Sequence, residues 1–230
     1  MMKSKELAVT YTENEMGDAF QVRASSKKGL PGIGCFWRVF REVDSWRGRP
    51  DFVCLQKEGN EDFPIRTNGL GLVGATILAS LNRSTGQTFE AIQQKTGYAE
   101  SSVKQALTRL LTGGFIKKDR NEKFKVVPGQ GLDDLETVAF ELKLKNAKRA
   151  LYQAQQYRCF ADRVYVVVPP QLVGSFDKYQ ETMSLWGIGL ASFDPIKKRF
   201  RVEIQSAGKK PKTKHQAFYT IMNAISSDAR

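Results

Sequence analysis

Carboxylates and lysines are the side chains on which any chemistry of this 230-residue chain must depend. The sequence holds one histidine, His215, and three cysteines that are far apart and in no C-x-x-C arrangement. A structural zinc site, a Ser-His-Asp triad and a Cys-His pair therefore all lack parts. Glu141 and Lys143 are two positions apart in a strand-like segment, so both side chains project from the same face. A solvent-facing strand commonly carries such a pair as well, and this alternative stays open here.

The segments around this pair read as strands and helices of an α/β domain. Residues 136–145 alternate, with an apolar stripe from Val138 to Leu144 on the face opposite Glu141 and Lys143. Further strands are expected at residues 36–43, 50–55, 163–168, 187–193 and 199–204, and helices at residues 146–160, 172–185 and 216–225. We therefore expect a sheet domain built from both ends of the chain.

The middle third reads as three helices followed by a hairpin. Helices are expected at residues 74–81, 88–96 and 100–111, with Thr88 as the N-cap of the second and Gly97 at its end. The apolar positions of the third helix fall at helical spacing and should face a core: Val103, Ala106, Leu107 and Leu110. After this helix, two short apolar stretches flank a polar and basic hairpin.

This order of elements resembles a winged helix-turn-helix, and the stretch T-G-Y-A-E-S-S-V-K-Q-A-L-T-R-L-L is similar to the second half of that motif. The resemblance implies that the third helix enters the major groove of duplex DNA. Ala99 departs from the pattern, because a capping Ser or Thr would be usual there. The candidate DNA-binding residues are the non-core helix positions Ser101, Ser102, Lys104, Gln105, Thr108 and Arg109 and the hairpin positions Lys117, Lys118, Arg120 and Lys123. A module that packs against protein is the alternative.

The charge of the chain favours a polyanionic partner. There are 36 Lys and Arg against 24 Asp and Glu, a net charge of +12. Residues 1–64 are neutral, whereas residues 65–130 and residues 131–230 each carry a net +6. Such an excess is typical of proteins that bind nucleic acid. The basic tract at residues 209–214 is interpreted either as a loop that contacts phosphates or as a solvated loop.

No segment reads as a membrane span or a secretory signal. The longest nearly apolar stretch, residues 69–81, has 13 residues, too few to cross a bilayer, and residues 1–6 hold no apolar core. Cys35, Cys54 and Cys159 each have apolar or aromatic neighbours, as buried reduced thiols usually have. We therefore expect a cytoplasmic protein with no membrane partner.

The stretch G-R-P-D at residues 48–51, followed later by E-L-K at residues 141–143, resembles the PD-(D/E)xK nuclease superfamily. After the triplet, Gln153 and Tyr157 lie four apart in a helix, similar to the Q-x-x-x-Y element of RecB-like members. The resemblance covers residues 36–55 and 136–169, with the pieces in the expected order and context. It implies a restriction-endonuclease-like fold, a mixed β-sheet core flanked by helices, with the winged helix inserted.

The resemblance also implies metal-dependent hydrolysis of phosphodiester bonds. Asp51 and Glu141 would hold Mg²⁺, with Mn²⁺ as a substitute and the backbone carbonyl of Leu142 as a further ligand. The metal would acidify a water and neutralise charge on the phosphate. Lys143 would orient or deprotonate the attacking water and offset negative charge.

Other residues would support this site. Family members often add an acid from an early helix or the first strand; here Glu42 is the first choice, with Glu13 and Glu15 behind it. Gln153 and Tyr157 lie on one helical face, where they would position the phosphate or brace the metal site. A polar contact between helix and sheet is the alternative role for this pair.

About ninety residues separate Asp51 from Glu141. If their strands form an antiparallel pair, the two acids meet at its open end and the helical segment is inserted at the opposite end. A strand of about six residues spans roughly 20 Å, so the bound DNA would be read about that far from the cut. Asp133 or Asp134 is the rival metal acid, but neither leaves room for an intervening strand before Glu141.

These inferences combine into one hypothesis, a Mg²⁺-dependent DNA endonuclease. Its nuclease core would be split between residues 1–64 and 131–230, with the winged helix at residues 65–130. Symmetric cleavage of duplex DNA would need two active sites and hence a homodimer. The alternatives are a non-catalytic DNA-binding regulator on a nuclease-like scaffold and an RNA nuclease.

Overall fold

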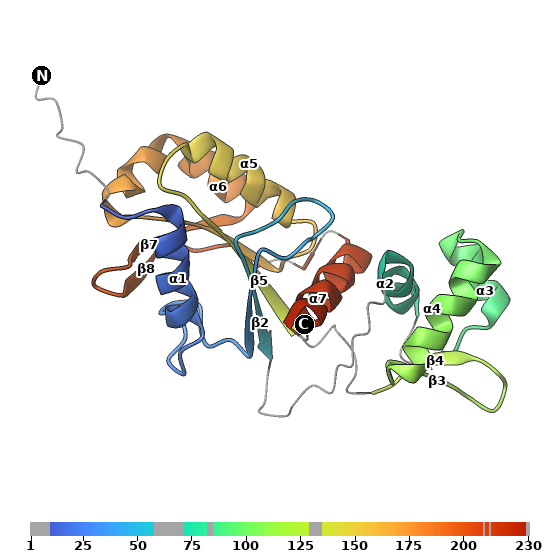
Figure 1. The fold of residues 1–230 in the computed structure, drawn as a ribbon. Coiled ribbons are helices and arrows are strands. Elements are labelled where there is room, and N and C mark those ends of the chain that lie inside the picture. The colour runs from blue at the N-terminus through green and yellow to red at the C-terminus, as the bar shows by residue number, and fades with distance from the viewer. Residues whose placement is uncertain are drawn as a thin grey trace, which may run out of the picture.

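The computed structural model describes residues 10–57, 71–81, 85–128, 135–208, 210–211 and 213–228. The protein is a mixed α/β structure in which a six-stranded sheet is flanked by helices (Figure 1). None of the helices among these residues is long and apolar enough to span a membrane. The predicted α/β class and mixed sheet are confirmed.

The sheet combines antiparallel edges with a parallel centre. Its strands, in spatial order, are β1 (Arg38–Arg41), β2 (Phe52–Lys57), β5 (Leu135–Leu142), β6 (Arg163–Val168), β7 (Ile188–Asp194) and β8 (Arg199–Ile204). β5, β6 and β7 run parallel to one another, and the other neighbours pair antiparallel. Parallel neighbours need crossovers, and helices supply both of them.

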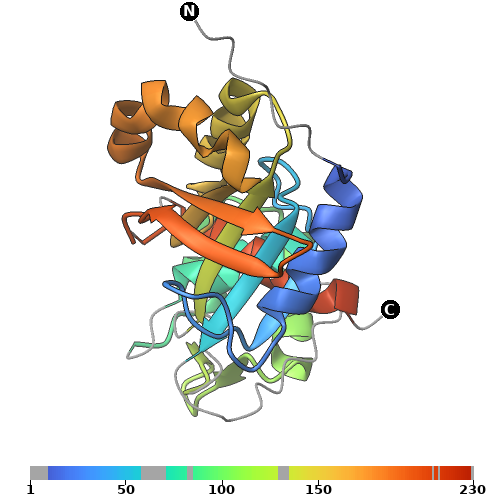
Figure 2. The same cartoon turned by 90° about the vertical axis from the view of Figure 1, so that its left-hand side faces the viewer.

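Helices cover both faces of the sheet. α1 (Glu13–Ala24) packs on one face of the sheet (Figure 2). Its Phe20 contacts the rings of Phe52 and Phe140. The other face is covered by α5 (Ala147–Tyr157), the 3₁₀ helix η2 (Pro170–Tyr179), α6 (Gln180–Trp186) and α7 (Lys214–Asp228). β5 is therefore buried on both faces. A solvent-facing strand, the alternative considered for Glu141, is wrong because α5 lies over the side that was expected to be wet.

β2 and β5 are adjacent and antiparallel, as predicted. Their register runs from Phe52 opposite Phe140 to Lys57 opposite Leu135. Asp51 comes directly before β2, and Glu141 lies next to the last residue of β5, so both acids reach the same end of the pair. The chain between β2 and β5 leaves and returns at the opposite end.

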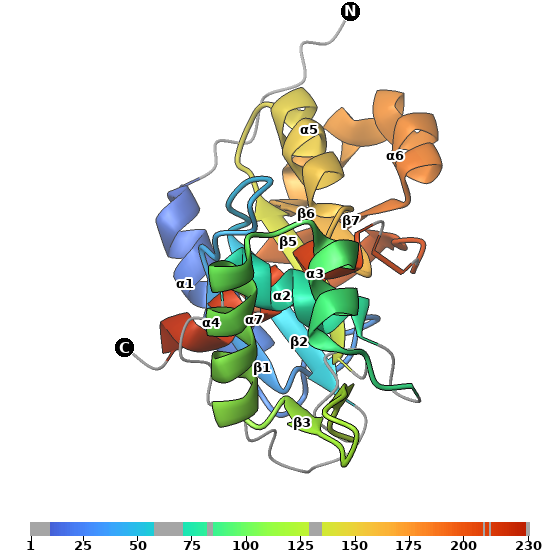
Figure 3. The same cartoon turned by 90° about the vertical axis from the view of Figure 1, so that its right-hand side faces the viewer.

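That intervening chain contains three helices and a hairpin (Figure 3). They are α2 (Gly71–Ser80), α3 (Phe89–Thr96), α4 (Glu100–Thr112), β3 (Ile116–Lys118) and β4 (Phe124–Val126). Thr88 caps α3 and Gly97 ends it with a left-handed φ of 70°, as predicted. Ala99 makes no side-chain cap, and the buried residues of α4 are the four expected from its spacing.

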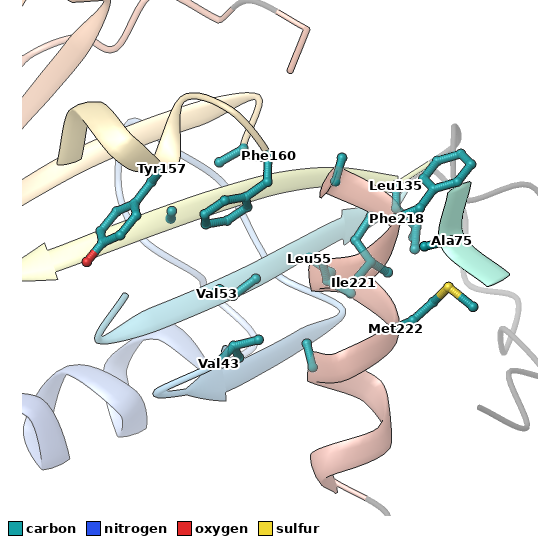
Figure 4. Close-up of a cluster of buried hydrophobic side chains, with 14 of the residues drawn as sticks. Val43, Val53, Leu55, Ala75, Leu135, Tyr157, Phe160, Phe218, Ile221 and Met222 are labelled. Atoms are coloured by element: carbon teal, nitrogen blue, oxygen red, sulfur yellow. The ribbon is translucent and has the colours of Figure 1, made fainter. Parts of the chain in front are cut away.

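α2 packs on α7 and so joins this segment to the sheet. Ala75 of α2 and Phe218, Ile221 and Met222 of α7 belong to one buried cluster, which continues through Leu55 into the sheet (Figure 4). The core is thus continuous from the sheet to α2. The predicted domain boundaries at residues 64–65 and 130–131 lie outside the described residues, as do Asp133 and Asp134.

Some local expectations were wrong. β5 ends at Leu142, whereas the alternating pattern predicted a strand to residue 145. All three cysteines are free, but only Cys54 is buried and Cys35 is exposed. The basic tract is described only at Lys210, Pro211, Thr213 and Lys214, and Lys214 opens α7.

Candidate active site

Glu141 is the buried centre of a cluster of charged side chains. Its side chain is 1% exposed, and both of its oxygens have protein partners. Lys143 Nζ lies 2.8 Å from Oε1, and the hydroxyl of Tyr157 donates to Oε2 at 2.7 Å. The partners come from the end of β5 and from the last turn of α5, so the strand-to-helix connection closes around this carboxylate.

Asp51 joins the cluster from the neighbouring strand. The backbone N–H of Leu142 donates to Asp51 Oδ2 at 2.7 Å, across 91 residues of sequence. This bond extends the β2–β5 ladder by one side-chain contact and fixes Asp51 beside Glu141. The structure therefore brings Asp51, Glu141 and Lys143 together, as predicted.

Glu13 is the third acid beside Lys143. One of its oxygens, Oε2, lies 3.8 Å from Lys143 Nζ, and the other accepts from the N–H of Leu144 at 3.2 Å. As the first residue of α1, Glu13 is placed by the capping box of Thr12 and Glu15. That box was readable in the sequence as T-x-x-E before Met16, and it would have shown that a helix begins here.

Glu42, the preferred upstream acid of the sequence analysis, lies beside Asp51: its N–H donates to the Asp51 carbonyl at 3.0 Å, and its charge helps to raise the pKa of Asp51. Its carboxylate pairs with Arg49 at 3.4 Å, with about half of its side chain exposed. The carboxylate of Glu15 accepts hydrogen bonds from the N–H and the hydroxyl of Thr12. Of the three acids, Glu13 is therefore the one that contacts Lys143.

The pKa shifts of the two acids reflect desolvation. Burial raises the pKa of Asp51, and the Leu142 N–H and Lys143 offset only part of this effect. Burial also raises the pKa of Glu141, and the nearby negative charge of Asp51 raises it further. Hydrogen bonds from Lys143 and Tyr157 lower this pKa but do not cancel the rise. Two close carboxylates in a poorly hydrated site repel each other, which favours uptake of a proton or of a cation.

Lys143 and Tyr157 are held in their protonated forms. Burial alone would lower the pKa of Lys143, but the hydrogen bond and charge of Glu141, with Asp51 and Glu13, outweigh it and raise the pKa. Burial and Glu141 raise the pKa of Tyr157 well above its usual value. Both groups therefore donate hydrogen bonds at neutral pH, and neither is suited to accept a proton.

Gln153 lies one turn before Tyr157 on α5, with its side chain hydrogen-bonded to that tyrosine. Its Oε1 is buried and has no hydrogen-bond partner. An unpaired buried carbonyl oxygen is costly, so a donor is expected to approach it in the working state. Tyr157 thus makes a polar contact between α5 and the sheet at Glu141, which is the alternative role that the sequence left open for this pair.

The donor set fits a Mg²⁺ ion with a small protein shell. No group of three or more His, Cys, Asp and Glu side chains suited to a metal occurs within the described part of the chain. Mg²⁺ is usually held by one or two carboxylates, with water and substrate phosphate completing the shell. Asp51 and Glu141 supply such a pair, and Leu142, whose carbonyl is the further ligand expected, directly follows Glu141 and donates its N–H to Asp51. Because both Glu141 oxygens already have donors, a cation must share Oε1 with Lys143 or displace it.

The candidate DNA-binding residues lie apart from this cluster, on α4 and the β3–β4 hairpin. Most of them are exposed: Ser101, Lys104, Gln105, Thr108, Arg109, Lys117, Lys118, Arg120 and Lys123, whereas Ser102 is half-buried. Lys104 pairs with Glu100 at 2.5 Å, and Lys118 pairs with Glu122. A cavity of about 600 Å³ lies between α3, α4 and the hairpin, with Phe89, Leu107 and Phe124 among its walls.

Comparisons with known proteins do not assign the chain to a family. No protein-family model matches it, and a comparison with curated proteins also finds no match. Function must therefore be inferred from the chemistry of the site itself.

Proposed function

We propose that this protein is a divalent-metal-dependent DNA endonuclease of the PD-(D/E)xK type, with a restriction-endonuclease-like core and an inserted winged helix. The observation that carries the proposal is the meeting of Asp51, Glu141 and Lys143 at one end of β2 and β5, where burial raises the pKa of both acids. Acids that are desolvated and placed side by side weaken the fold unless a cation binds them. Such a cost is expected at a functional site and has no structural benefit.

Mg²⁺ would be held by Asp51, Glu141 and the carbonyl of Leu142, with water and substrate phosphate completing its shell. When bound, the ion supplies Lewis acidity toward water and neutralises charge on a phosphate. Two further acids would add negative charge around the ion: Glu13 contacts Lys143 and Leu144, Glu42 lies beside Asp51, and both raise the pKa of Asp51.

The side chains around the ion would orient the reactants. Lys143 keeps its proton because its pKa is raised, so it would hold the attacking water and offset phosphate charge without acting as a base. Tyr157 fixes the rotamer of Glu141 through its hydroxyl, a role that needs only the neutral phenol. Gln153 would offer its unpaired oxygen to a donor in the same site.

DNA would be bound by α4 and the β3–β4 hairpin. The exposed face of α4 carries short polar and basic side chains while its apolar face is fully buried. This division suits a helix that docks in a groove, and the basic hairpin suits phosphate contacts. Two copies of the chain would be needed to cut both strands symmetrically, so a homodimer on DNA is part of the proposal.

The decisive experiment compares Asp51→Asn and Glu141→Gln with Glu181→Gln, an exposed acid on α6, as the control. Purified proteins are incubated with duplex DNA, single-stranded DNA and RNA, with Mg²⁺, with Mn²⁺ and with EDTA. The two site variants should lose metal-dependent cleavage while keeping DNA affinity, and the control should cut normally. A Glu141→Gln protein that cuts at the wild-type rate would leave the DNA-binding regulator as the better hypothesis.

A further inference from the structure

The loop between β1 and β2, which leads into Asp51, presents an exposed tryptophan, Trp46. Trp46 is 59% exposed, while most other aromatic side chains of the protein are buried or half-buried. An indole ring in water is unfavourable and has no packing benefit at this position beyond one edge contact with Tyr219. A large exposed aromatic residue next to a catalytic site is a candidate for contact with substrate.

The loop is built to hold Trp46 in one place. Asp44 Oδ1 accepts from the N–H of Trp46 at 3.0 Å, and Asn223 of α7 donates to the carbonyl of Asp44 at 3.2 Å. Ser45 is fully buried, and its N–H and hydroxyl both donate to the carbonyl of Gly48. Trp46 itself has a φ of 66°, a left-handed conformation that bulky residues rarely adopt. Backbone strain in a well-anchored loop indicates that the position of Trp46 is important for function.

The loop that carries Trp46 reaches the candidate active site through Gly48. The Gly48 Cα faces Tyr157 so closely that an added Cβ would lie 3.3 Å from the ring, and the hydroxyl of that ring holds Glu141. Asp51 follows Trp46 by five residues, so the two Cα atoms can be at most about 18 Å apart. This limit allows at most a few nucleotides of a strand between Trp46 and a phosphate that lies at Asp51.

Positive charge accompanies the ring. Arg47 and Arg49 are both exposed in the same loop. Arg49 is oriented by Glu42, whose carbonyl accepts from Nε at 2.8 Å and whose carboxylate lies 3.4 Å from Nη2. An aromatic platform flanked by cations is the combination by which proteins bind single-stranded nucleic acid without reading its sequence.

We propose that Trp46 stacks on an unpaired base beside the phosphate that is cut, so that the preferred substrate is DNA with a duplex part and a single-stranded or distorted part. This inference rests on the proposed nuclease function and adds its substrate class. The duplex part lies against α4, and the unpaired part passes over the β1–β2 loop to Asp51. Stacking of one base on an aromatic ring typically strengthens binding by about 5- to 150-fold.

Binding without cleavage tests this directly. In EDTA, fluorescence anisotropy measures the affinity of three probes, a duplex, a single strand and a duplex with a single-stranded tail. Trp46→Ala should weaken binding of the tailed probe by about 5-fold or more and leave the duplex little changed. Trp46→Phe should restore most of the affinity. Leu185→Ala, which removes another large exposed apolar side chain on α6, is the matched control and should bind all probes normally.

The outcomes separate this inference from the proposed function. Wild-type protein that binds and cuts DNA, but whose affinity for tailed and duplex probes falls equally or not at all in Trp46→Ala, overturns the stacking role alone. Wild-type protein that binds none of the probes overturns the nuclease proposal and the stacking role together. Trp46→Gly relieves the left-handed φ, so its melting temperature should not fall, and the same loss of tailed-probe affinity in this variant shows that the effect is not misfolding.

Discussion

The same chemical pair occurs in two regions of this protein with opposite electrostatic consequences. Glu100 and Lys104 on α4 lie 2.5 Å apart with more than half of each side chain exposed, and the bond lowers the pKa of Glu100. Glu141 and Lys143 lie 2.8 Å apart at the end of β5, yet burial and Asp51 raise the pKa of Glu141. Water screens the charges of the first pair, whereas burial and the neighbouring carboxylate of Asp51 destabilise the charged form of Glu141 in the second. The difference supports the proposed function, in which the sheet carries the chemistry and the helices contact a polyanion.

Replacing the lysine of each pair should break this comparison if it is wrong. Lys143→Met should reduce the cleavage rate at saturating DNA by about 10²- to 10³-fold, because a charge aimed at the reacting phosphate is lost. Lys104→Met should leave that rate unchanged and act only on affinity. Single-turnover cleavage at saturating protein measures the effect, with circular dichroism to show that both variants are folded. Equal losses of cleavage rate in the two variants would mean that catalysis and DNA binding are not separated between the two regions.

The boundary between the two regions can be located by deletion. One buried cluster contains residues of α2, α7, α3 and α4, and α2 packs more extensively on α7 than on α4, so we assign α2 to the sheet region although it follows β2 in the chain. Replacing residues 85–128 with a Gly/Ser linker should leave a folded protein with weak, poorly selective nuclease activity. Extending the deletion through α2 uncovers Phe218, Ile221 and Met222, which should destabilise the fold by at least about 3 kcal/mol. Urea denaturation of the two proteins measures the difference, and equal stability would place α2 with the helices.

Metal binding should relieve the strain that distinguishes Glu141 from Glu100. At a free Mg²⁺ concentration of one hundred times Kd, the ion should stabilise the fold by about 2.7 kcal/mol. The double variant Asp51→Asn, Glu141→Gln should gain nothing from Mg²⁺. Thermal melts with and without the ion make the comparison, and a wild-type protein that Mg²⁺ leaves unchanged at neutral pH would count against the metal site.

The pH dependence follows from the same two acids. Their folded-state pKa values are raised, so the stability that their protonated forms contribute is complete below the unfolded values and is lost as pH rises through the folded values. Without metal, lowering the pH from neutral should therefore stabilise the site. The stabilisation by Mg²⁺ should become smaller on acidification, because protons compete with the ion for the two carboxylates. Melts of wild type and the double variant over this range isolate the contribution of the two acids.

Sequence was a good guide where the signal is local or follows strand order. The buried positions of α4 and the Thr88 cap were predictable from spacing and residue type, whereas the pairing of β2 with β5 was predicted from the nuclease resemblance. α1 was missed because its buried residues, Met16, Gly17, Phe20 and Ala24, include only two large apolar side chains. Glu13 could not be ranked above Glu42, because its contact with Leu144 spans 131 residues and exists only after folding. The burial of Glu141 likewise depends on where α5 docks.

The smallest expected effect concerns the exposed region. If Arg109 and Lys117 each contact a phosphate, then Arg109→Ala and Lys117→Ala should each reduce the slope of log Kobs against log salt by about one unit. The single-turnover cleavage rate at saturating protein should not change, because neither residue lies near Asp51. Lys178→Ala, an exposed lysine on η2, is the control and should keep the wild-type slope. Affinity measured from 50 to 200 mM salt in EDTA gives the slopes. If the salt slopes of both variants match that of the control, Arg109 of α4 and Lys117 of the hairpin do not contact phosphate. The phosphate contacts would then come from cations nearer the sheet, and Arg47 and Arg49 are the first to test.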